Sequence, residues 1–356
     1  MNQSVWRRTS VLAVTVALFL AAAPARAQST EASAEAEAQT GVQLPYRGSL
    51  VIYEHSTRLW AFTDEELTYN PYYVHSLSLR PRWYFNDHVW GRLQLDLEQE
   101  ITDADDTTTA NEVRVAGTSL DFNYSDLELF ENMTAAGRVT FGFPTDKISQ
   151  LRTMYLSTGL RAALAYKLPS VAKGLTLGLG GAFTKYFNRY ADGDVDVLQY
   201  CSGSRGTAEQ CTATGVMNPN FRLVWEATAA LQALDNLGIT ASFLVYNTWA
   251  YSTPDAEITT STGDVLVERS ADDTRLRALN RFTLDVTYDF TKYFGVSVGT
   301  DTYTGQLADD ATYRNPFFNR FTNFYVDLNL TVDELVKAVS PSATASLGPR
   351  TAMASQ

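Results

Sequence analysis

The chain has 356 residues, with 28 basic and 40 acidic side chains, a net charge of −12 and a pI near 4.8. This acidic balance excludes a typical nucleic-acid-binding protein, because the phosphate backbone attracts basic surfaces. Beyond residue 27 there is no run of about 18 apolar residues, which argues against a transmembrane helix in that part of the chain.

Residues 1–27 have the three parts of an export signal. Two arginines precede an apolar run over residues 11–23, and the small residues Ala25 and Ala27 fit the pocket of a signal peptidase. We therefore expect cleavage after Ala27 and an exported protein. The small, polar and acidic residues 28–46 are expected to form a disordered leader.

Strands are predicted where apolar and polar side chains alternate, because successive side chains of a strand point to opposite faces. Leu93, Leu95 and Leu97, for example, alternate with charged or amide side chains. The alternation slips between Tyr124 and Leu127, which predicts a β-bulge. Twelve strands are expected, over residues 48–59, 73–85, 89–101, 116–129, 136–143, 154–168, 174–187, 219–232, 236–250, 274–290, 292–304 and 317–331.

The connections between the predicted strands are alternately short and long. Transmembrane β-barrels have short turns on one side of the membrane and long loops on the other. A soluble exported β-sandwich is the alternative, but it gives no reason for loops to be sorted by parity. Tyrosine, tryptophan and phenylalanine gather near both ends of the strands, for example Tyr186 and Tyr246 near long loops and Trp90 near a short turn. This predicts aromatic girdles at two membrane interfaces.

With these features the chain resembles Gram-negative, porin-like outer-membrane β-barrel proteins. The resemblance covers residues 47–331 and implies an all-β fold, a closed antiparallel transmembrane barrel with short periplasmic turns and long extracellular loops. It also implies contact with outer-membrane lipid and lipopolysaccharide. The strand at 321–330 resembles the final strand that the barrel-assembly machinery recognises, although residues 332–356 follow it. That segment is expected to be a periplasmic tail, with a short helix at 332–339 and disorder beyond. No oligomeric state is predicted.

Cys201 and Cys211 are the only two cysteines, and both lie in the longest predicted loop. An exported chain meets an oxidising compartment, so one disulfide between them is expected. Closing so short a loop would contribute about 2–3 kcal/mol to its order.

A twelve-stranded barrel has a backbone radius of about 12 Å, so inward side chains leave a narrow passage. The alternation assigns nearly equal numbers of basic and acidic side chains to the inner face. The basic ones are Arg80, Arg82, Arg92, Arg138, Arg161, Lys167, Arg222, Arg275, Arg277 and Arg281; the acidic ones are Asp96, Glu98, Glu100, Asp121, Glu226, Asp285, Asp289, Asp301 and Asp327.

Two arrangements of these charges remain open. Cross-strand pairs, such as Arg80 and Arg82 with Asp96 and Glu98, would close the lumen. Alternatively, the two signs would line separate walls and orient a polar solute. Small inward residues on several strands, among them Gly159, Gly180 and Ser242, favour an open volume.

The histidines do not predict an enzyme. Glu54 adjoins His55 and Ser76 adjoins His75, but neighbours in a strand point to opposite faces and cannot form a catalytic pair. His88 lies in a turn. No cofactor or metal site is expected. The sequence therefore favours a channel for ions or small polar solutes. A structural or interaction barrel, such as an adhesin or a partner in an export assembly, is the alternative.

Overall fold

The computed structural model describes residues 45–59, 72–102, 111–191, 217–252, 256–259, 265–268, 275–308 and 310–339. The predicted signal peptide, nearly all of the leader, both cysteines and the end of the predicted tail lie outside these residues. The strands are β1 (Leu50–Arg58), β2 (Tyr73–Arg80), β3 (Arg82–Tyr84), β4 (Val89–Glu100), β5 (Val113–Phe130), β6 (Met133–Phe143), β7 (Met154–Leu168), β8 (Leu175–Asn188), β9 (Pro219–Leu234), β10 (Leu237–Ala250), β11 (Ala256–Thr259), β12 (Val265–Glu268), β13 (Leu276–Asp289), β14 (Phe294–Gly305) and β15 (Thr322–Thr331).

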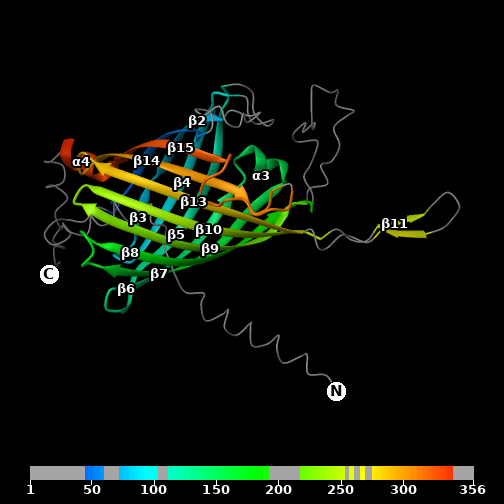
Figure 1. Ribbon diagram of the computed structural model, residues 1–356, viewed down its shortest axis with the longest axis horizontal. Helices are drawn as coiled ribbons and strands as arrows, with labels where there is room; N and C mark the ends of the chain where they lie inside the picture. The colour runs from blue at the N-terminus through cyan, green and yellow to red at the C-terminus, as the bar shows by residue number, and fades with distance from the viewer. Residues whose placement is uncertain are drawn as a thin grey trace, which may run out of the picture.

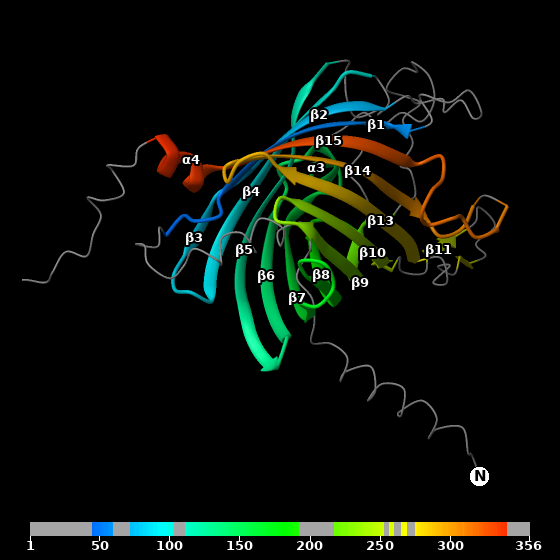
Figure 2. The ribbon, with the colours of Figure 1, turned by 60° about the vertical axis from the view of Figure 1, so that its left-hand side comes forward.

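The main sheet is a closed barrel in which each strand pairs antiparallel with its neighbours (Figures 1 and 2). It closes because β1 pairs with β2 on one side and with β15 on the other. β2 and β3 both pair with β4 in the same register and form one barrel strand, interrupted at Pro81, which has no N–H to donate. The predicted twelve-stranded antiparallel barrel is therefore confirmed.

The predicted irregularity in β5 is also confirmed. The register between β5 and β6 shifts between Tyr124 and Leu127, and Asp126 has φ of 62°. Aspartate tolerates this left-handed backbone better than most residues, because its short side chain can form local hydrogen bonds. The last strand begins five residues later than predicted, since Asn315 accepts a hydrogen bond from the Phe317 amide (2.9 Å) in a turn before it.

The long and short connections lie at opposite ends of the barrel. One end, called the long-loop end, carries α3 (Lys147–Leu151) and a hairpin of β11 and β12 that the alternation did not predict (Figure 1). The other, short-turn end carries both ends of the barrel chain and α4 (Val332–Val339), which occupies the residues predicted to be helical. Among the described residues, no helix is long and apolar enough to cross a bilayer.

The short-turn end is fastened where the first and last strands meet. The Val332 amide donates to the Ser49 carbonyl (2.8 Å), and the Gly48 amide donates to the Asp333 carboxylate (2.8 Å). Burial raises the pKa of Asp333, while the Gly48 amide and Lys337 oppose that rise. α4 therefore starts from a fixed point on the barrel.

The two faces of the wall have opposite polarity. Large apolar side chains lie on the outer face, and Leu160 and Leu179 are 61% and 59% exposed. Charged side chains are buried on the inner face, where Asp121 is 2% and Arg92 8% exposed. A protein in water buries its apolar side chains instead. The inverted distribution is that of a barrel with lipid outside and polar groups inside.

A close approach at Gly299 fixes one part of the inner face. The Tyr325 ring passes over Gly299 on β14, so that its hydroxyl donates to the Asp285 carboxylate on β13 (3.0 Å). A Cβ at position 299 would collide with the Tyr325 hydroxyl and with the Leu284 carbonyl.

We expect Gly299→Ala to destabilise the barrel by about 1–3 kcal/mol, because the added methyl group overpacks this crossing. Urea titration of protein folded into lipid vesicles measures the effect. Gly117→Ala is the matched control, since nothing lies within 4 Å of its added methyl group. Equal stability of the two variants would contradict the crossing.

Candidate functional site

A chain of charges runs around the inside of the barrel from β4 to β9, centred on Asp121. Its carboxylate accepts from Arg92 Nε (3.0 Å) and Nη2 (2.5 Å), and from the Thr140 hydroxyl (2.6 Å). Arg138 Nη1 lies 3.8 Å from the same carboxylate. One buried acid therefore balances two arginines on neighbouring strands.

The next pair in this chain reaches across a whole strand. Arg161 on β7 forms an ion pair with Glu226 on β9. The β8 residues opposite them in register are Ala182 and Gly180, whose small side chains leave room for the arginine to pass. Arg138 and Arg161 are opposite each other in register. The ion pair of Arg161 with Glu226 therefore also reduces the repulsion between these two arginines. Each of these predicted inward residues is thus engaged with another.

The far side of the barrel holds a second set of paired charges. Arg281 on β13 donates to both carboxylate oxygens of Asp301 on β14, at 2.8 and 3.0 Å. Asp285 is buried and accepts from Tyr325 and Thr287, and Asp327 is buried on β15. These contacts fix the side chains and leave little of their charge for a passing solute.

The register does not place Arg80 and Arg82 directly opposite Asp96 and Glu98. Register places Ser78 opposite Asp96, whose carboxylate accepts from Ser78 (2.5 Å) and Gln94 (2.7 Å).

The described contacts of Glu98, Arg80 and Arg82 are with other side chains. Glu98 pairs with Arg114 on β5 (3.3 Å), an arginine that the alternation did not assign. Arg80 Nε donates to the Ser78 hydroxyl (2.9 Å), and Arg82 is buried against the Trp90 ring, 4.7 Å from its centroid.

Two of the remaining predicted residues, Lys167 at the end of β7 and Asp289 at the end of β13, lie near the short-turn end. The others lie near the long-loop end. Glu100 is buried at the end of β4, Arg275 precedes β13, and Arg277 is exposed near the start of β13. Arg222 on β9 donates through Nε to the Thr248 hydroxyl (2.9 Å). Its guanidinium lies 5.5 Å from the ring centroids of both Tyr186 and Tyr246. Both tyrosines, predicted as girdle residues, therefore contact an inward-facing arginine.

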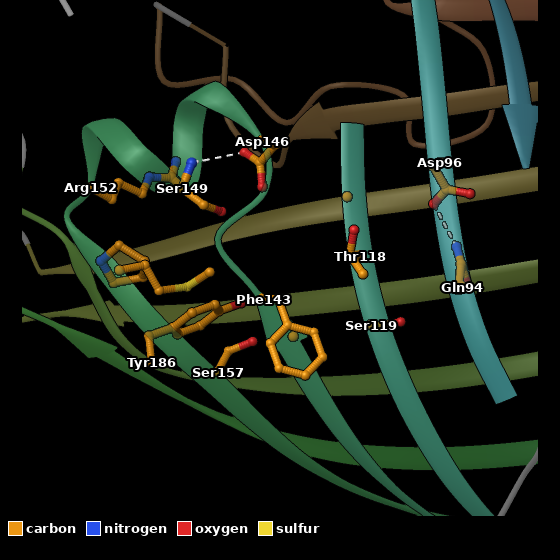
Figure 3. A pocket seen from close by; sticks show the side chains of 14 residues that line it. Gln94, Asp96, Thr118, Ser119, Phe143, Asp146, Ser149, Arg152, Ser157 and Tyr186 are labelled. Atoms are coloured by element: carbon orange, nitrogen blue, oxygen red, sulfur yellow. Dashed lines mark hydrogen bonds between the residues drawn. The ribbon is translucent and has the colours of Figure 1, made fainter. Parts of the chain in front are cut away.

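The loop that carries α3 encloses a cavity against the inner wall at this end (Figure 3). The Asp146 side chain caps the helix by accepting from the Ser149 amide (2.8 Å), and Lys147 pairs with Glu112 (2.5 Å). The cavity has a volume of about 240 Å³. Among its lining residues are Gln94, Asp96, Ser157, Tyr186, Asp146 and Arg152.

The cavity has an acidic and a basic side. Figure 3 shows Asp96 and Gln94 on one side and Arg152 and Tyr186 on the other. Burial lowers the pKa of Arg152; the Tyr186 hydroxyl and Asp146 oppose this, while the positive charges of Arg222 and Arg277 add to it. Arg152 therefore shares its surroundings with two arginines on the wall. Arg152 could not be predicted from the alternation, because loop residues follow no strand period.

The histidines contact tyrosines. Tyr53 hydroxyl and His75 Nδ1 are 3.0 Å apart, and Tyr73 hydroxyl and His55 Nδ1 are 3.1 Å apart. The rings of His55 and His75 meet edge to face, with centroids 4.3 Å apart. Neither contact has the serine or carboxylate partner of a hydrolytic triad.

Searches for relatives show likeness in architecture alone. No family model matches the chain, and no curated protein matches its sequence. Solved structures that resemble it include the NanC porin (11% identity, TM-score 0.42, covering 79% of this chain and 98% of that one). An outer membrane channel from Pseudomonas putida F1 is 13% identical, with a TM-score of 0.47 and coverage of 83% and 98%. The KdgM porin in complex with disordered oligogalacturonate is 8% identical, with a TM-score of 0.36 and coverage of 79% and 98%.

The closed barrel, its apolar exterior and its charged interior define the class of protein. The chain is a closed antiparallel β-barrel of twelve strands with porin-like architecture. The candidate site is the cavity beneath the α3 loop, which side chains of both charges line.

Proposed function

We propose that the protein is a passive outer-membrane channel for ions or small polar solutes, with a narrow charged lumen. The observation that carries this proposal is the cavity between the α3 loop and the inner wall, with Asp96 on one side and Arg152 on the other. Opposite charges across a narrow passage produce a transverse field, which favours solutes with a matching dipole or charge.

The proposal includes a location and partners. The apolar outer face supports contact with membrane lipid, and we propose lipopolysaccharide as the outer-leaflet component. The alternating final strand supports insertion by the barrel-assembly machinery. The short-turn end would then face the periplasm, and the α3 loop would narrow the extracellular entrance.

A structural or interaction barrel with a closed lumen is the second candidate. The chain of ion pairs from Arg92 to Glu226 favours it, because paired charges occupy the inner wall across several neighbouring strands. No catalytic role is proposed for either the open channel or the closed barrel.

Single-channel recording in planar bilayers tests the proposal. We expect discrete conductance steps from the refolded wild-type protein, and larger steps when residues 147–151 are replaced by two glycines, because α3 no longer narrows the lumen. A silent wild type would contradict the channel. If the double variant Arg161→Ala, Glu226→Ala also conducted where the wild type does not, the closed barrel would be the correct function.

A further inference from the structure

Three arginines at the long-loop end of the lumen form no ion pair with a carboxylate of the described residues. Arg222, Thr248 and Arg277 lie opposite one another in register on β9, β10 and β13, so both arginines share one row of the wall. Arg152, from the α3 loop, lines a cavity together with Tyr186, and the guanidinium of Arg222 lies 5.5 Å from the Tyr186 ring. Within the described part of the chain, none of the three forms an ion pair, whereas Arg92, Arg161 and Arg281 each do.

The hydrogen bonding of Arg222 leaves its charged end available. Nε donates to Thr248, which is itself buried, and this bond fixes the plane of the guanidinium. The Tyr186 and Tyr246 rings lie close to it at 5.5 Å. The two terminal nitrogens have no protein acceptor among the described residues. A guanidinium held in this way is preorganised to bind a planar oxyanion through two parallel hydrogen bonds.

The backbone of Arg152 in the α3 loop is also held by hydrogen bonds. The Asn218 side chain, 2% exposed, donates to the Arg152 carbonyl (2.9 Å), and the Arg152 amide donates to the Ile148 carbonyl (3.0 Å). These bonds fix the backbone that presents Arg152 to the cavity. Asp146 offsets part of the positive charge around Arg152, but three like charges still repel one another, and a bound anion would reduce this repulsion.

We propose that Arg152, Arg222 and Arg277 form an oxyanion-binding site at the constriction, which captures small carboxylate- or phosphate-bearing solutes for passage. This inference rests on the proposed channel function and names the class of solute. Of the three arginines, Arg152 lines the cavity of about 240 Å³, a volume that limits the ligand to a small molecule. Arg222 lies next to this cavity, 5.5 Å from the ring of Tyr186, which also lines it. Hydroxyl and amide groups of Ser157, Gln94 and Ser149 line the same cavity and would bind the polar remainder of such a solute.

The test uses the intact protein and three anions: chloride, gluconate as a hydroxylated carboxylate, and inorganic phosphate. We expect gluconate and phosphate to block the chloride current of the wild type at saturable, millimolar concentrations. The triple variant Arg152→Gln, Arg222→Gln, Arg277→Gln should weaken this block by on the order of tenfold or more, since each lost charge-assisted hydrogen bond is substantial. Its reversal potential in a chloride gradient should also shift towards cation selectivity.

Arg189→Gln is the matched control. Arg189 is an exposed arginine at the same end of the barrel that stacks on Tyr190 at 5.1 Å. Removing it changes the net charge of the entrance without touching the three arginines of the site, so block by gluconate and phosphate should be unchanged. An equal loss of block in the control and in a single Arg222→Gln variant would show that only the general charge of the mouth matters, and would overturn the site.

Calorimetric titration of gluconate and phosphate into detergent-solubilised protein separates this inference from the channel itself. Binding that the triple variant abolishes, in a protein without conductance, would support the site and refute the channel. Conductance without saturable block or binding would refute the site and retain the channel. Block by phosphate alone would restrict the solute class to phosphates, and block by gluconate alone would restrict it to carboxylates.

Discussion

Asp121→Asn is expected to destabilise the barrel by about 3–5 kcal/mol, because it removes one partner of a buried charge cluster and leaves the others uncompensated. The Asp121 side chain is 3% exposed, and those of Arg92 and Arg138 are 9% and 19% exposed. Asparagine keeps the shape of the side chain but not its charge. Urea titration of protein folded into lipid vesicles gives the free energy of unfolding directly.

Asp126→Asn is the control for this prediction, since it removes the same charge from the same strand. Asp126 is exposed in the bulge at φ of 62°, a conformation that asparagine also tolerates, so its effect should stay within about 0.5 kcal/mol. The double variant Asp121→Asn, Arg92→Gln should recover part of the loss, with a coupling of about 0.5–3 kcal/mol. Asp121→Asn and Asp126→Asn of equal stability would mean that the cluster is solvated.

The fold was predictable because a barrel wall has one simple rule, period-two alternation between lipid and lumen. The strand predicted at 154–168 has the bounds of β7, and the slip in phase before Leu127 marks a real bulge. What the alternation did not find was structure in the loops. α3 and the hairpin of β11 and β12 are short, and their packing does not depend on a lipid-facing side.

The site was only partly predictable, because alternation gives the face of a residue but not its partner. Arg275, Arg277 and Arg281 share a face in sequence, yet Arg281 pairs with Asp301 while Arg277 is exposed and lies opposite Thr248. Partners depend on register, which is set by all the turns together. Residue type alone also gave a wrong position for Trp90. A tryptophan near a strand end was expected in a girdle, but Trp90 is buried against Arg82.

Leu284→Arg tests whether the outer face meets lipid. Leu284 is 36% exposed near the middle of β13, between the half-buried Phe282 and the exposed Val286 on the same face. An arginine at the midplane of a bilayer costs about 2–4 kcal/mol, because hydrocarbon cannot solvate its charge. We expect a loss of this size in vesicles.

The same substitution at the neighbouring residue, Thr283→Arg, shows whether lipid or water surrounds the barrel. Thr283 points inward and lies opposite Asp301 in register, so an arginine there has both water and a carboxylate within reach. Thr283→Arg should therefore cost much less than Leu284→Arg, although it inserts the same side chain one residue away. In a water-soluble barrel the order would reverse, because the exposed Leu284 would tolerate a charge and the half-buried Thr283 would not. The sign of the difference between these two variants thus tests whether lipid or water surrounds the barrel.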